Sequence, residues 1–161
     1  MGIINYFKGK TEDGKDKMVM IHYFGLPGIP FKYPCNMIIN PEKSALEFSD
    51  IITKDRASVL LPFNKITGVG SVSVKEIEAQ RMSGVNRRGD LFIDTAIKVL
   101  RNLDYKERKK CGYLYIVNYL HNDTIASIIL RENGNMNYSK FHKSLKQYIA
   151  EKEISKKDII L

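Results

Sequence analysis

The sequence predicts a mainly β protein with helices: a seven-stranded antiparallel barrel, capped by a C-terminal amphipathic helix and carrying a helical insertion before the sixth strand. Three observations predict this fold class. Short runs of β-branched and aromatic residues alternate with turn residues along most of the chain. The pattern becomes helical and basic between about residues 80 and 110, and a last apolar stripe at helical spacing follows residue 138.

Length and composition favour one domain over residues 1–161. The chain is 43% hydrophobic and 27% charged, which suits one folded domain with its own core. Residues 8–17, KGKTEDGKDK, are polar, and the segment 1–17 is predicted to be flexible or peripheral. The N-terminus lacks the features of a secretory signal, and no apolar run reaches the ~20 residues of a membrane span, so we expect a cytoplasmic protein.

The stretch FGLPGIPFKYPC, residues 24–35, separates strands predicted at 18–24 and 35–40. Proline fixes its backbone angle and lacks a hydrogen-bond donor, so this stretch is unsuited to an interior strand or a helix. We interpret it as a rigid extended crossing between two parts of the β framework. The alternative is an exposed apolar lip for a partner, formed by Leu26, Ile29, Phe31 and Tyr33.

The next segments predict a hairpin over 35–49 that turns at Pro41, and a fourth strand over 57–63 that ends near Pro62. Residues 65–78 alternate apolar and polar side chains around Val72 and Val74, which predicts a fifth strand with one face in water.

The segment 81–110 predicts a basic helical insertion. A helix is expected from Leu91 to Asn102, with Asp90 as its N-cap and apolar side chains at Phe92, Ala96, Val99 and Leu100. Basic residues outnumber acidic ones across the segment, and a solvated charged surface is the ordinary explanation. The alternative is contact with an anionic ligand through Arg81, Arg87, Arg88, Lys106, Arg108, Lys109 and Lys110.

The segment 111–120 predicts a central strand buried on both faces, and 121–123 predicts a tight turn into a seventh strand over 124–132. Its tyrosines at 113, 115 and 119 could pack in the core or stack on nucleic-acid bases. The final helix carries an apolar stripe opposite three lysines; the stripe is Tyr138, Phe141, Leu145, Tyr148 and Ile149.

Three blocks carry a resemblance to a known family: GLPGIPFKYPCNMIINPEKSALEF, VLLPFNKITGV and YLYIVNYLHNDTIASIIL. Together with the final helix they resemble bacterial pleckstrin-homology-like (PH-like) domain proteins of uncharacterised function, found in Gram-positive bacteria and their mobile elements. The resemblance implies a PH-like fold and a non-enzymatic binding or scaffolding role, with no catalytic residues to transfer. The charged segment 81–110 departs from the Gly- and Ala-rich segment of that family.

No residue pattern predicts catalysis, a cofactor or a metal site. The candidate metal ligands form no CxxC, HxxxH or HExxH spacing; they are His22, Cys35, Cys111, His121 and His142. The chain has no GxSxG nucleophile motif, and the glycines at 68 and 70 lack the neighbours of a phosphate loop.

We therefore predict a non-enzymatic PH-like binding or assembly module. Its expected partner is another protein or a second copy of the chain, and an anionic lipid surface is a further possibility because of the basic insertion. The alternative function is nucleic-acid binding through the segment 81–110 and the strand tyrosines.

Overall fold

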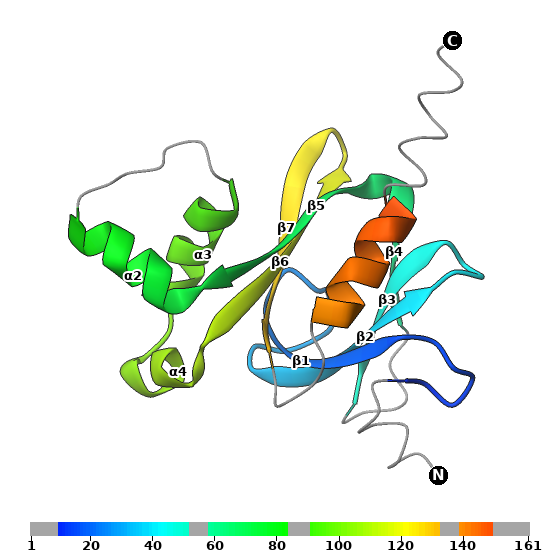
Figure 1. The fold of residues 1–161 in the computed structure, drawn as a ribbon, viewed down its shortest axis with the longest axis horizontal. Coiled ribbons are helices and arrows are strands. Elements are labelled where there is room, and N and C mark those ends of the chain that lie inside the picture. Colours follow the sequence, from blue (N-terminus) through cyan, green and yellow to red (C-terminus); the bar gives the residue numbers. More distant parts are fainter. Residues whose placement is uncertain (1–9, 52–57, 84–90, 133–138, 150–161) are drawn as a thin grey trace.

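Seven strands in one antiparallel sheet form the centre of the protein in a computed structural model (Figure 1). The structure describes residues 10–51, 58–83, 91–132 and 139–149, with 80–83 and 91–95 described by their backbone alone. The strands are β1 Lys17–Phe24, β2 Tyr33–Asn40, β3 Ala45–Asp50, β4 Val59–Pro62, β5 Ile66–Ser73, β6 Tyr113–His121 and β7 Thr124–Glu132. The helices are η1 Phe63–Lys65, α2 Val74–Ser83, α3 Leu91–Arg101, α4 Tyr105–Lys110 and a helix at residues 139–149, called the 139–149 helix below.

The strands pair in the order β4-β3-β2-β1-β7-β6-β5, and each neighbouring pair is antiparallel. A mainly β protein with helices is therefore confirmed. The predicted closed barrel is wrong: β4 and β5 are the two edges of the sheet, and no pairing between their described residues closes it. The chain leaves β4 at Pro62 and passes through η1, whose Phe63 is buried in the core, before it enters β5.

A first hydrophobic core lies between the two halves of the sheet and the 139–149 helix, drawn in orange in Figure 1. It joins Met37 and Phe48 of the β1–β4 half to Val117 of the β5–β7 half. Phe141 and Leu145 of the helix are buried in the same cluster, and Tyr148 and Ile149 pack against it. The predicted apolar stripe is confirmed for these four residues, whereas Tyr138 lies outside the described residues.

A second core lies on the opposite face of β6 and β7, beneath the helices between β5 and β6. Leu114, Ile116 and Ile129 of the sheet meet Ile77 of α2 and Leu100 of α3. Figure 1 shows α2, α3 and α4 gathered on this side, away from β2, β3 and β4. The prediction that β6 is buried on both faces is confirmed, since Tyr115 and Val117 belong to the first core.

The helical insertion begins earlier than predicted. The strand expected over 65–78 ends at Ser73, and α2 follows immediately. Ser73 Oγ accepts a hydrogen bond from the Glu76 backbone N–H at 3.4 Å, and Ser-x-x-Glu is the capping-box signature of a helix start. The apolar Val72 and Val74 alternate with polar residues, and this pattern favoured a strand over a helix start. The predicted helix at 91–102 is confirmed as α3, while its proposed N-cap, Asp90, lies outside the described residues.

The proline-rich stretch is a folded loop between neighbouring strands, which corrects the predicted extended crossing. β1 and β2 pair directly, so residues 25–32 only connect a hairpin. Gly25 has φ +101°, and a Cβ there would lie 2.2 Å from the Ser127 carbonyl oxygen, so only glycine fits. The loop folds around the His22 ring: Nδ1 lies 3.0 Å from the Pro30 carbonyl oxygen, and Nε2 accepts from the Leu26 N–H at 3.1 Å.

This arrangement predicts a pH-dependent loss of stability. The His22 ring uses Nδ1–H as donor and Nε2 as acceptor, which requires the neutral form, and burial lowers its pKa below the ordinary value. The unfolded chain therefore binds a proton that the folded chain does not, so this contribution is complete above about pH 6.5 and is lost as pH falls below it. We expect chemical unfolding at pH 7 and pH 5 to show a larger fall in stability for the wild type than for His22→Gln. Equal falls in the two proteins would contradict the neutral ring.

Residues before β1 form a local turn rather than only a loose tail. Lys10 bridges to Asp16 in backbone pairing and by a side-chain ion pair, and the Ile39 N–H donates to the Asp16 carbonyl at 3.0 Å. Within the segment 1–17 that the sequence predicts to be flexible or peripheral, residues 10–16 therefore have local structure. Residues 1–9 lie outside the described residues.

Candidate functional site

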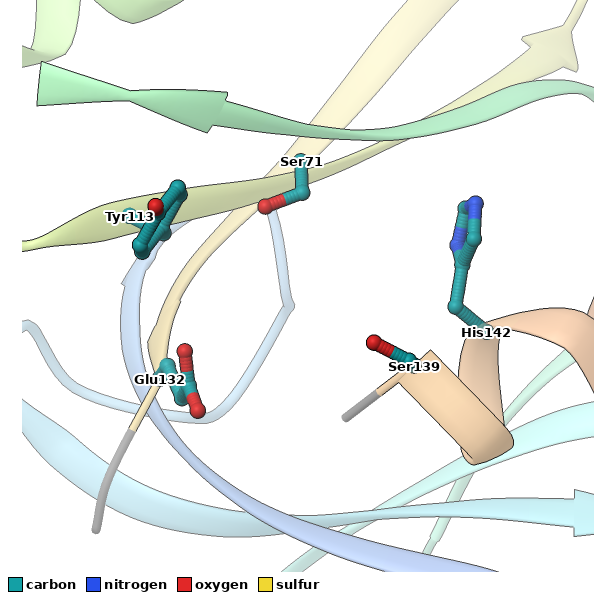
Figure 2. A pocket seen from close by; sticks show the side chains of 5 residues that line it. All are labelled: Ser71, Tyr113, Glu132, Ser139 and His142. Carbon is teal, nitrogen blue, oxygen red and sulfur yellow. The ribbon is translucent and has the colours of Figure 1, made fainter. Parts of the chain in front are cut away.

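A pocket of about 460 Å³ lies at one end of the space between the sheet and the 139–149 helix. It is lined by Ser71 of β5, Tyr113 of β6, Glu132 of β7, and Ser139 and His142 of the helix. Figure 2 shows these side chains arranged around one open space. The strand register explains why Ser71 lines the pocket. Ser71 pairs with Tyr115, whose side chain belongs to the first core, and paired residues share one face of a sheet.

The pocket presents hydrogen-bonding groups that have no partner among the described residues. No hydrogen bond or ion pair joins the side chains of Ser71, Tyr113, Glu132 or Ser139 to another described residue. Burial raises the pKa of Glu132, consistent with a carboxyl that lacks a cationic neighbour. His142 shares a hydrogen bond of 2.9 Å with the Tyr115 hydroxyl, and burial, followed by the charge of Lys146, lowers the pKa of its imidazole. A ligand group that donates hydrogen bonds fits this surface best.

The edge strand beside the pocket is unusually open. β5 has eight residues, ITGVGSVS, with no proline and no charged side chain, and it ends the sheet. The opposite edge, β4, has four residues and ends in Pro62. Natural sheets protect their edges with short strands, prolines and charges, because unpaired N–H and C=O groups attract other strands. By this criterion β4 is protected. β5 has one protective feature, a register shift between Ile66 and Gly68, and no described residue pairs with the outer edge of the remaining stretch to Ser73.

The predicted partner lip is half wrong. Leu26 and Ile29 are only 5% and 9% exposed, because the loop turns both side chains into the first core. Phe31 is 48% exposed and Tyr33 is also exposed, so the exposed part of the lip is reduced to these two rings.

The tyrosine platform for nucleic-acid bases, the alternative to core packing, is wrong for two of its three rings, which pack in or against the core. Tyr115 is 1% exposed in the first core, and Tyr119 packs against that core. Only Tyr113 is exposed, and it lines the pocket.

The structure places the predicted anionic-ligand contacts in different environments. Lys106, Lys109 and Lys110 are exposed on α4. Arg108 turns inward, where its Nε donates to the carbonyl oxygens of Leu100 at 2.9 Å and Leu103 at 3.1 Å. Arg108 therefore satisfies the C-terminal end of α3 and is unsuited to the predicted role. The side chain of Arg81, and the whole of Arg87 and Arg88, lie outside the described part of the chain.

A buried polar cluster beneath α4 was missed by the sequence analysis. Glu107 is 6% exposed, and its Oε1 accepts from the Tyr23 hydroxyl at 2.6 Å. Arg131 Nε donates to the Tyr23 hydroxyl at 2.9 Å and lies 3.6 Å from Glu107 Oε1. Lys32 Nζ lies 3.7 Å from Glu107 Oε2. These contacts tie α4 to β1, β7 and the 25–32 loop, and no local spacing signals them.

The cysteines and histidines do not gather into a reactive or metal-binding group among the described residues. Cys35 lies in the first core and Cys111 in the second, and both thiols are free. Burial raises the pKa of Cys35 to about 12 and also raises that of Cys111, so both favour the unreactive thiol form.

Comparison with known protein families, curated proteins and solved structures finds no match. In the described part of the chain, no helix has the length and apolar character needed to cross a bilayer.

Proposed function

We propose that the protein is a non-enzymatic PH-like binding module that pairs an extended segment of a partner protein with the free edge of β5. The strand order supports the PH-like part of the proposal, since two antiparallel meanders, β1–β4 and β5–β7, are joined through β1 and β7 and packed by a final helix. The observation that carries the binding role is the edge of β5 beside the pocket, with which no described strand pairs.

In strand addition, affinity and specificity come from different contacts. Main-chain hydrogen bonds to an edge supply affinity for any extended segment, whereas pockets for alternate side chains select the sequence. Ser71 lies on β5 and lines the pocket, so a segment paired with β5 runs past the pocket mouth. Glu132 is a carboxyl without a described partner, and His142 favours its neutral form. We therefore infer that the pocket receives a lysine, an arginine or another side chain that donates hydrogen bonds.

Selection of phage-displayed random peptides on the wild-type protein tests this function. Ser71→Trp places a large side chain at the pocket while keeping β5, so peptides that bind the wild type should lose most of their affinity for this variant. Asn102→Trp, at an exposed position after α3, is the matched control and should bind them normally. Glu132→Gln should weaken peptides with a lysine or arginine more than peptides without one.

Two results would count against the proposed function. One is the absence of enriched peptides, and the other is enrichment of peptides that bind Ser71→Trp as tightly as the wild type. Sedimentation velocity on the same proteins tests whether a second copy of the chain pairs with β5 instead of a partner protein. A wild-type dimer that Ser71→Trp dissociates would show that it does.

A further inference from the structure

The outward face of α4 is a compact basic and aromatic surface. Residues four apart share one side of a helix, so Tyr105 lies beside Lys109 and Lys106 beside Lys110. Lys109 Nζ lies 4.7 Å from the centre of the Tyr105 ring, which is 71% exposed. Figure 1 shows α4 at the lower left margin of the molecule, away from the 139–149 helix.

The inward face of α4 holds the helix in place without help from the outward side chains. Glu107 is fixed by Tyr23 and Arg131, and Arg108 donates to the end of α3. Asp104 caps the helix by accepting from the Glu107 backbone N–H at 2.8 Å. The outward lysines and Tyr105 are therefore not needed to pack the helix, and they face solvent.

The 25–32 loop adjoins α4 and carries a second exposed ring. Lys32 Nζ approaches Asp104 Oδ2 at 4.0 Å and Glu107 Oε2 at 3.7 Å, which holds the loop against α4. The adjacent Phe31 is about half exposed, and its ring centre lies 5.6 Å from that of Tyr23. Phe31 is therefore an exposed ring on a loop that Lys32 ties to Asp104 and Glu107 of the α4 region.

The acids of this region do not neutralise the lysines. Both acidic groups of α4 and its cap, Asp104 and Glu107, contact Lys32, and Glu107 also pairs with Arg131. Lys106, Lys109 and Lys110 form no ion pair with a described residue. The outward face therefore carries positive charge that no described acid compensates.

We propose that this α4 surface, formed by Tyr105, Lys106, Lys109 and Lys110 with Phe31 on the adjoining loop, binds the anionic headgroups of a lipid membrane. Lysines gain from the negative potential of such a surface, and exposed aromatic rings favour the headgroup level of a bilayer. Nucleic acid is a poorer fit, because Arg108 Nε donates to the carbonyl oxygens of Leu100 and Leu103 and is therefore not available for a two-bond phosphate contact through Nε. The site is separate from the β5 edge and does not depend on the proposed peptide binding.

Co-sedimentation of the full chain with vesicles tests the proposal. The wild type should bind vesicles of phosphatidylcholine mixed with phosphatidylglycerol, should bind pure phosphatidylcholine weakly, and should be released by salt. The triple variant Lys106→Glu, Lys109→Glu, Lys110→Glu should lose roughly a hundredfold in affinity. Its matched control is Lys65→Glu, Lys143→Glu, Lys146→Glu, which changes the net charge equally at exposed lysines elsewhere and should retain most binding.

The aromatic contribution separates a membrane from a purely electrostatic partner. Phe31→Ala with Tyr105→Ala leaves the charge unchanged and should still weaken vesicle binding, with the fold checked by circular dichroism. The proposal is overturned if the wild type ignores anionic vesicles at low salt, or if both lysine triples lose affinity equally. It is also overturned if the aromatic variant binds as tightly as the wild type, or if duplex or single-stranded nucleic acid binds α4 in preference to vesicles.

Discussion

Replacing Glu107 with alanine is expected to lower the free energy of unfolding by about 3–5 kcal/mol. The variant removes the acceptor of the Tyr23 hydroxyl and the anionic partner of Arg131, while both groups stay in the same largely enclosed site. A buried cation without its partner costs far more than the intact pair contributes. Urea denaturation of wild type and variant measures the difference directly.

Two further variants make this prediction specific. Glu107→Gln keeps an oxygen acceptor for Tyr23 and removes the charge, so its loss of stability should be intermediate. Glu78→Ala removes an exposed acid from α2 and should change stability by less than about 0.5 kcal/mol. A Glu107→Ala change as small as that of Glu78→Ala would show that the cluster does not hold α4.

Replacing Leu145 with alanine is expected to lower the free energy of unfolding by about 2–5 kcal/mol. Leu145 is fully buried in the first core between the two halves of the sheet, and its loss leaves a cavity lined by side chains that cannot fully collapse. The control is Lys146→Ala on the same helix, where the side chain is exposed and alanine preserves the helix. Equal stability of the two variants would mean that the 139–149 helix does not contribute to the core.

The strands were predictable because their signals are local. The run from Met18 to Phe24 is rich in β-branched and aromatic residues, and the Asn122-Asp123 pair adopts the positive φ angles that a two-residue hairpin turn needs. Closure of the sheet was not predictable in this way. Whether β4 meets β5 depends on how much the whole sheet bends and on the path through η1, and neither leaves a pattern in neighbouring residues.

The basic insertion shows where charge counting fails. Arg108 and Lys109 are neighbours in one run of charges, yet Arg108 reaches two carbonyl oxygens of the α3 end while Lys109 faces solvent. Glu107 lies in the same run and is buried against residues 84 and 24 positions away, Tyr23 and Arg131. Helical phase decides these roles, and the helix predicted over 91–102 ends before this run.

The pocket was not predictable from the sequence for a related reason. Ser71, Glu132 and His142 come from segments far apart in the chain and form no motif. Only the strand register and the position of the 139–149 helix bring them together. The sole local hint was Ser71 at an alternating polar position, and that pattern was assigned to the wet face of a strand.

Amide hydrogen exchange along β5, with and without a peptide selected on the wild type, tests the central claim most directly. In the free protein, only the amides of Ile66–Ser73 that bond to β6 should be protected. Because an added strand bonds to the remaining ones, the peptide should protect alternate amides that were open before. Protection confined to α4 or to β4, with β5 unchanged, would contradict strand addition at this edge.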